Sequence, residues 1–243
     1  MASLRWPAKL GAGFAAAILL SIGLAGAAGF FDRDAETVFV PPGNGQRALA
    51  AVLFSGDMGL RFGMGPYIVR ALARHDVPVL GVSSPSAFGA HKSRAEVEAI
   101  VAGAIRDAVV KTGARQVVMI GQSFGADMVR VGLAALSPAL RDRVAAVVLV
   151  VPGRDAWFRA DPTGLAYRAV PDAGPENPRA LAWAPVVCIK GAAERDSLCP
   201  LLDGPDLRAI TLPGGHFLRN DHALLVGTIL DALRPVLAAG SRA

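Results

Sequence analysis

The chain is poor in several residue types, and each shortage argues against a class of protein. Two cysteines and four histidines are too few for a disulfide-rich miniprotein or a zinc cluster, so neither a metal nor another cofactor is expected. Charged residues make up only 19% and aromatic residues 6% of the chain. No Lys/Arg cluster longer than a dipeptide accompanies the net charge of +5, so no nucleic-acid partner is expected either.

Hydrophobic residues are abundant instead. They form 53% of the 243 residues, and the mean hydropathy is +0.42. This composition excludes a disordered chain, a collagen and a coiled coil. The length suits one α/β domain with a substantial core.

One apolar run stands out, at the N-terminus. Arg5 and Lys9 precede an uncharged stretch from Leu10 to Phe31, which contains the small tripeptide Ala25–Ala27. This order is typical of a signal peptide, predicted here over residues 1–27. An uncleaved membrane anchor is the alternative, because the run is long enough to span a bilayer. In both cases the positive charges before the run predict a periplasmic location for the rest of the chain. Residues 28–243 are expected to form a single domain.

The two cysteines fit an exported protein. Cys188 and Cys199 lie eleven residues apart. In an oxidising compartment, a pair this close predicts a disulfide, with two separate buried thiols as the alternative.

The body alternates apolar strands with helical patterns. A capping box over residues 93–96 begins the longest predicted helix, and a turn signal between the first two strands suggests an opening hairpin. Unbroken apolar strands predict a mostly parallel, doubly wound α/β sheet covered on both faces. A Pro-, Gly- and Asp-rich stretch over residues 152–185 is interpreted as a short cap region. Strands are expected at 37–40, 49–54, 79–82, 116–120, 145–151, 186–189 and 207–212, and helices at 66–73, 94–111, 126–135 and 224–237.

The clearest chemical signal is Gly-Gln-Ser-Phe-Gly at residues 121–125. It lies between a predicted strand and a predicted helix, the context in which G-x-S-x-G carries a nucleophilic serine on a sharp turn. Ser123 is therefore the predicted nucleophile.

A serine on such a turn needs an acid and then a histidine, in that chain order. His216 follows the last predicted strand through Pro213–Gly215, at the edge of the sheet where a general base reaches the serine. The loop after the preceding strand holds two candidate acids, Asp196 and Glu194. Asp196 is favoured because it lies near Cys199, where a disulfide would fix the loop.

The oxyanion hole requires two main-chain N–H groups. Phe124 follows the serine directly, and the loop after the strand at 49–54 offers Asp57, with Met58 as the alternative.

Four motifs together resemble the VirJ/AcvB family of exported bacterial α/β-hydrolases. They are Phe54–Asp57, Gly121–Asp127, Cys188 with Asp196–Pro200, and Leu212–His216. The resemblance implies an α/β-hydrolase fold and hydrolysis of lysyl-phosphatidylglycerol, a membrane phospholipid, at the periplasmic membrane face. It also implies a link to virulence and to type IV secretion components as possible partners.

The sequence departs from the family pattern at three places, none of them in the predicted triad. Gln122 stands in place of a tyrosine, Met58–Leu60 in place of Gly-Gly-Trp, and Phe217 in place of a second histidine.

An aminoacyl ester carries an ammonium group, which carboxylates near the serine would bind. Asp57 and Asp127 are the predicted substrate-binding residues, although Asp127 is equally explained as an acid at a helix start. The sequence thus predicts a periplasmic serine hydrolase acting on aminoacyl-phospholipids. A general periplasmic carboxylesterase and a non-catalytic, secretion-associated binding protein are the alternatives.

Overall fold

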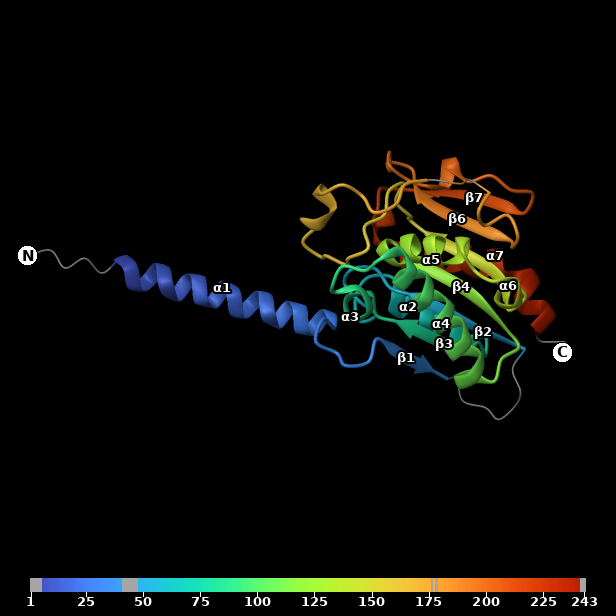
Figure 1. Ribbon diagram of the computed structural model, residues 1–243, viewed down its shortest axis with the longest axis horizontal. Helices are drawn as coiled ribbons and strands as arrows, with labels where there is room; N and C mark the ends of the chain where they lie inside the picture. The colour runs from blue at the N-terminus through green and yellow to red at the C-terminus, as the bar shows by residue number, and fades with distance from the viewer. Residues whose placement is uncertain (1–5, 41–47, 176, 178, 241–243) are drawn as a thin grey trace, which may run out of the picture.

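The computed structural model describes residues 6–40, 48–175, 177 and 179–240. They form a seven-stranded sheet in the order β1-β3-β2-β4-β5-β6-β7, parallel throughout except for β1 (Figure 1). The predicted α/β class is therefore confirmed. The strands are β1 (Glu36–Phe39), β2 (Leu49–Phe54), β3 (Val79–Val82), β4 (Gln116–Gln122), β5 (Val144–Val150), β6 (Val186–Gly191) and β7 (Leu207–Leu212).

Seven α-helices and three 3₁₀ turns complete the described chain. The helices are α1 (Trp6–Ala28), α2 (Gly65–Arg74), α3 (Ser84–Phe88), α4 (Arg94–Thr112), α5 (Phe124–Ala134), α6 (Pro138–Arg141) and α7 (His222–Gly240). The 3₁₀ turns are η1 (Ala166–Arg168), η2 (Cys199–Leu201) and η3 (Leu218–Asn220).

The core lies on both faces of the sheet. Along β2, Val52 and Phe54 point to one face and Ala51 and Leu53 to the other, as the two-residue period of a strand requires. Helices α4 and α5 cover the first face, and α2 and α7 cover the second (Figure 1). All six residues of β2 are buried, so its apolar sequence follows from its central position.

The predicted opening hairpin is wrong. β1 pairs antiparallel with β3, and β3 lies between β1 and β2. The physical reason is burial: β2 has parallel neighbours on both sides, β3 and β4, whereas β1 is partly exposed and suits the sheet edge. The turn residues between β1 and β2 lie outside the described residues.

Helix α4 begins as predicted. The Ser93 hydroxyl accepts a hydrogen bond from Glu96 N, and the Glu96 carboxylate accepts one from Ser93 N at 2.7 Å. Gly113, in the left-handed region at φ 70°, ends the helix.

Within its described residues, the segment 152–185 contains one short 3₁₀ turn, η1, and is held together by polar contacts. The Trp157 indole N–H donates to Ala169 O, and the Tyr167 hydroxyl accepts from Asp161 N. A bridge between Gly153 and Ser197 joins the segment to the loop after β6. This segment therefore lies over the carboxyl end of the sheet.

Helix α1 projects away from the body (Figure 1). Its C-terminal end is fixed to the domain by Arg61, which donates to Ala27 O at 3.3 Å and pairs with Asp32 at 2.9 Å. Ser86 donates to Gly29 O at 2.6 Å. Because these contacts come from the segments that follow β2 and β3, α1 reaches the body at the carboxyl edge of the parallel strands.

Helix α7 is long and apolar enough to cross a membrane by length and composition, with a mean hydropathy of 1.4 over His222–Ala239. Its buried residues Leu225, Ile229 and Leu233 pack into the core beneath the sheet. They make α7 part of the globular fold.

Candidate active site

Ser123 occupies a strained turn between β4 and α5. Its backbone has φ 52° and ψ −124°, a conformation that non-glycine residues rarely adopt outside functional sites. The flanking glycines are required by space: a Cβ on Gly121 would lie 2.4 Å from Ala126 Cα, and one on Gly125 would lie 2.4 Å from Phe54 O. The turn therefore presents the Ser123 hydroxyl at the carboxyl edge of the sheet.

His216 meets this hydroxyl from the loop after β7. Its Nε2 lies 2.7 Å from Ser123 Oγ. Gly214, at φ 99°, turns the loop, and a Cβ on Gly191 would lie 2.4 Å from Gly215 O. The ends of β6 and β7 thus approach closely enough to bring His216 to the serine. The short distance between His216 Nε2 and Ser123 Oγ is the geometry that the predicted general base requires.

The acid beside His216 is Glu194, and the prediction of Asp196 for this position is wrong. Glu194 Oε1 lies 2.9 Å from His216 Nδ1, and its side chain is only 7% exposed. The second carboxylate oxygen accepts from Gly191 N at 2.6 Å. These contacts fix both the carboxylate and the orientation of the imidazole.

The reason is the tight turn that follows β6. Glu194 N donates to Gly191 O, and Ala193 N donates to Gly214 O, so the chain folds back beneath His216 within three residues of the strand end. Asp196 is exposed, and its carbonyl accepts from Arg154 N at 2.7 Å. The chain has therefore passed His216 before Asp196 is reached.

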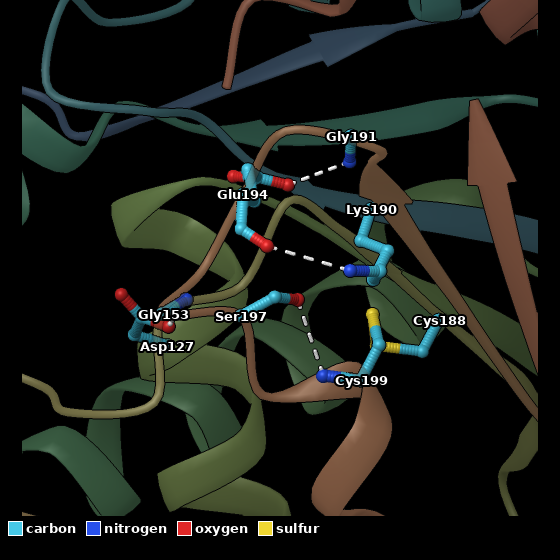
Figure 2. Close-up of a disulfide and its surroundings, with 8 residues drawn as sticks. All are labelled: Asp127, Gly153, Cys188, Lys190, Gly191, Glu194, Ser197 and Cys199. Carbon is cyan, nitrogen blue, oxygen red and sulfur yellow. Dashed lines mark hydrogen bonds between the residues drawn. A yellow bond between two sulfur atoms is a disulfide. The ribbon is translucent and has the colours of Figure 1, made fainter. Parts of the chain in front are cut away.

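The predicted disulfide is confirmed. Cys188 and Cys199 are bonded, with Cα atoms 5.4 Å apart. Figure 2 shows the bond below the loop that carries Glu194, whose main-chain oxygen also accepts from Lys190 Nζ. The disulfide therefore joins the buried strand β6 to η2 and closes a loop of residues 188–199.

An oxyanion hole requires main-chain N–H groups that are not already bonded to a carbonyl. In the described part of the chain, the N–H groups of Phe124, Asp57 and Met58 donate to no carbonyl. Phe124 and Asp57 remain the predicted pair, and Met58 the alternative.

A cavity of about 180 Å³ opens beside Ser123 and His216. Among its described lining residues are five carboxylates and no lysine or arginine. Asp57 and Asp127 are the acids that the sequence predicted near the substrate. Asp155 and Asp196 also line the cavity, and sequence reasoning did not predict this position for them. The position of Asp155 shortly after β5 could have indicated that it lines the pocket, because the carboxyl ends of parallel strands meet at one edge of the sheet. The carboxylates belong to Asp57, Asp127, Asp155, Glu194 and Asp196.

Burial changes the acid strength of two of these groups. It raises the pKa of Asp57 to about 6, against the lowering effect of the Tyr167 hydroxyl and the His216 charge. It also raises the pKa of Asp127 well above its usual value, although the nearby Arg130 charge opposes the shift. Asp127 Oδ1 accepts from Gly153 N at 2.9 Å, so this residue also anchors the start of the segment 152–185.

His91 and His222 contact residues outside the triad, and His222 also lines a cavity that reaches Ser123. The His91 ring lies 2.8 Å from Asp172 and is largely exposed. His222 begins α7 and stacks on Tyr67 at 3.9 Å between ring centroids. The described residues contain no group of three or more His, Cys, Asp or Glu placed to hold a metal ion.

Comparison with protein families identifies the family to which this chain belongs. The family described as bacterial virulence protein (VirJ) matches residues 48–237. This chain belongs to the VirJ family. The match spans β2 to α7, and therefore includes Ser123, Glu194 and His216.

Solved structures similar to this VirJ-family chain are α/β-hydrolases. Est1E from Butyrivibrio proteoclasticus is 14% identical, with 82% of this chain and 94% of that chain covered and a TM-score of 0.57. A putative thioesterase from Silicibacter sp. is 20% identical, with 93% and 94% covered and a TM-score of 0.58.

A third similar structure is XC6422 from Xanthomonas campestris, described as an a/b serine hydrolase without lid. It is 15% identical, with 82% of this chain and 88% of that chain covered and a TM-score of 0.57. At these identities the likeness establishes the α/β-hydrolase fold. A search of curated proteins finds no match.

Proposed function

We propose that this VirJ-family protein is an exported serine hydrolase that cleaves the ester of a cationic aminoacyl group, such as that of lysyl-phosphatidylglycerol. One observation carries the proposal. The aligned Ser123, His216 and Glu194 side chains open directly into a cavity lined by carboxylates. A binding protein has no use for such an alignment, and a general esterase has no use for so many acids.

The geometry supports an acyl-enzyme mechanism. Ser123 Oγ attacks the ester carbonyl while His216 Nε2 takes the hydroxyl proton, and Glu194 stabilises the imidazolium that forms. The oxyanion accepts hydrogen bonds from the N–H groups of Phe124 and Asp57. When the C–O bond breaks, His216 gives its proton to the departing alcohol oxygen. A water molecule, activated by the same histidine, then releases the amino acid and regenerates Ser123.

The acidic cavity supplies the preference for a cation. At neutral pH, Asp57 is mostly ionised because its pKa is about 6, and Asp155 and Asp196 also line the space beside Ser123. Carboxylates in a partly desolvated pocket attract an ammonium group more strongly than they would in bulk water. An acyl group with an α-ammonium and a side-chain ammonium matches this lining.

Export and membrane attachment complete the proposal. The disulfide is typical of an oxidising compartment. Helix α1 has 23 residues, about 34 Å at 1.5 Å per residue, enough to span the hydrocarbon core of a bilayer. Because α1 meets the body at the edge that carries Ser123, a retained α1 would place the active site toward the membrane surface.

Labelling with a fluorophosphonate probe tests the enzyme class. The folded protein should be labelled, and Ser123→Ala should abolish the labelling. If the folded wild type is not labelled, or if the variant is labelled equally, Ser123 is not an activated nucleophile and the protein is not a serine hydrolase of this kind.

The cationic preference is tested with ethyl esters of hexanoic acid, norleucine and lysine. They share a six-carbon chain and carry no, one and two ammonium groups. We expect kcat/KM to rise along the series, and Asp196→Asn to reduce the lysine-to-norleucine ratio roughly 3- to 10-fold. Asp231→Asn, an exposed acid on α7, is the matched control and should leave the ratio unchanged. An equal rate for all three esters would favour a general carboxylesterase.

A further inference from the structure

A second cavity of about 290 Å³ also reaches Ser123. It shares Asp57, Ser123, Val151 and His216 with the acidic cavity, so one ester bound at Ser123 can extend into both. Its character is different, because Asp57 is the only carboxylate among its described lining residues. Its apolar side chains belong to Met58, Phe62, Met64, Val151, Pro162 and Phe217. We call this space the apolar groove.

The outer wall of the apolar groove is exposed. Met58 and Phe62 are each 43% exposed, and Phe217 is 71% exposed. Exposed apolar side chains that gather around a cavity mark a surface that binds an apolar group. The groove therefore suits a ligand whose outer part is hydrocarbon.

The inner end of the groove contains buried polar atoms that have no hydrogen-bond partner among the described residues, and they belong to Asp57, Gln122 and His222. Gln122 directly precedes the serine and is 9% exposed, and its amide oxygen has no hydrogen-bond partner among the described residues. The amide fits beside two glycines: a Cβ on Gly63 would lie 3.2 Å and one on Gly56 3.5 Å from its nitrogen. Leaving a buried carbonyl without a donor is destabilising, so this oxygen is suited to accept a hydrogen bond from a ligand.

We infer that the apolar groove is the leaving-group subsite, which takes the alcohol half of the ester, and that Gln122 recognises a hydroxyl on that alcohol. The inference rests on the proposed function, in which the acidic cavity holds the aminoacyl half. The groove then receives the other half. Gln122 adjoins Ser123, so the hydroxyl that it binds lies near the ester oxygen, as in a glycerol ester, with any hydrocarbon farther out along Phe62 and Phe217.

The reaction is consistent with this division. His216 lines both cavities, so the proton that it took from Ser123 can pass to the ester oxygen on the groove side. The ester C–O bond breaks, the acyl group stays on Ser123 Oγ, and the neutral alcohol leaves through the groove.

The hydroxyl contact is tested with two lysine esters, the 2,3-dihydroxypropyl ester and the propyl ester. The wild type should prefer the dihydroxypropyl ester, and Gln122→Met should lower that preference about 5- to 10-fold, the value of one hydrogen bond to a buried acceptor. Comparing ratios between variants cancels the intrinsic reactivity of the two esters and any general loss of activity. An unchanged preference in Gln122→Met would overturn the role of Gln122.

The hydrocarbon contact is tested with the ethyl and octyl esters of lysine. Phe217→Ser should lower the octyl-to-ethyl ratio of kcat/KM at least 3-fold and leave the lysine-to-norleucine ratio of ethyl esters unchanged. Val110→Ser, which removes an 80% exposed apolar side chain from α4, is the matched control and should change neither ratio. If Phe217→Ser changes only the lysine-to-norleucine ratio, the two halves of the ester lie the other way round. If no ester is hydrolysed in a Ser123-dependent way, the proposed function itself fails.

Discussion

At the scale of single residues, the position of one carboxylate determines the triad. Glu194 and Asp196 are two positions apart, and both line the acidic cavity. Only Glu194 contacts the His216 ring, at 2.9 Å, while its other oxygen is held by Gly191 N. The two acids therefore have different positions, because Glu194 contacts the imidazole and Asp196 only lines the cavity.

Replacing each acid by its amide tests whether their roles differ. Glu194→Gln should lower kcat/KM for ethyl hexanoate roughly 10²- to 10⁴-fold, because the imidazole loses its orienting charge. Asp196→Asn should change the rate for this neutral ester less than about 3-fold. Steady-state hydrolysis assays on folded variants measure both. Equal losses in the two variants would contradict the assignment.

The raised pKa of Asp57 predicts a pH dependence for cation selectivity. Burial raises this pKa to about 6, so the carboxylate gains its charge as pH rises through that value. The lysine-to-norleucine ratio of kcat/KM for ethyl esters should therefore increase between about pH 5 and 7. The ratio cancels any effect of pH that is common to both esters.

Asp57→Asn is the control for this pH profile. The variant keeps the main-chain N–H and loses the titrating charge, so the rise near pH 6 should flatten. A wild-type ratio that does not change with pH would show that Asp57 does not face the side-chain ammonium.

Sequence reasoning selected Ser123 and His216 of the candidate site because their signals are local. Ser123 lies in a motif whose glycines have no room for a Cβ, and His216 follows a strand in the required order. The triad acid was not predictable in the same way, because Asp196 and Glu194 share one loop. The main-chain hydrogen bonds of the turn after β6 decide between the two acids. Residue types in the sequence do not predict these hydrogen bonds.

At the scale of elements, the disulfide ties β6 to η2 beneath the loop of Glu194 (Figure 2). A covalent link across eleven residues restricts the unfolded chain and is worth about 3 kcal/mol in the loop-entropy estimate. The same link limits the motion of the loop that positions Glu194. Stability and activity should therefore depend on it together.

The double variant Cys188→Ala/Cys199→Ala tests this dependence. Its Tm should fall by roughly 5–10 °C, and its kcat for ethyl hexanoate should fall at a temperature where it is fully folded. Calorimetry and steady-state kinetics measure the two effects. A reducing agent should lower both quantities in the wild type and leave the variant unaffected. Unchanged kcat in the folded variant would reject a bracing role for the disulfide.

Strand order was harder to predict than strand position. Every expected strand of the body is present within a few residues of its predicted bounds. The pairing of β1 with β3 instead of β2 depends on long-range burial, because the fully apolar β2 takes a central place with two parallel neighbours. A turn signal between two strands does not show whether a third strand, here β3, will lie between them.

At the scale of the whole molecule, α1 and the active site lie at the same edge of the sheet. Arg61, which contacts the end of α1, is next to Phe62 in the wall of the apolar groove. This arrangement places the groove near the C-terminal end of α1.

Removing residues 1–28 tests this arrangement. The truncated protein should keep the kcat/KM of the full chain for lysine ethyl ester, because none of the described residues that line either cavity comes from α1. Its rate on lysyl-phosphatidylglycerol in vesicles should fall about tenfold or more, since it loses the local concentration that a tether provides. Equal rates of both proteins on vesicles would contradict a role for α1 in approaching the lipid.

Release of lysine from lysyl-phosphatidylglycerol by the purified full chain tests the proposed phospholipid substrate most directly. We expect equal amounts of free lysine and phosphatidylglycerol, formed by the wild type and not by Ser123→Ala. Lipid left intact by a protein that still hydrolyses soluble lysine esters would contradict the phospholipid substrate. Release that persists in Ser123→Ala would contradict the mechanism.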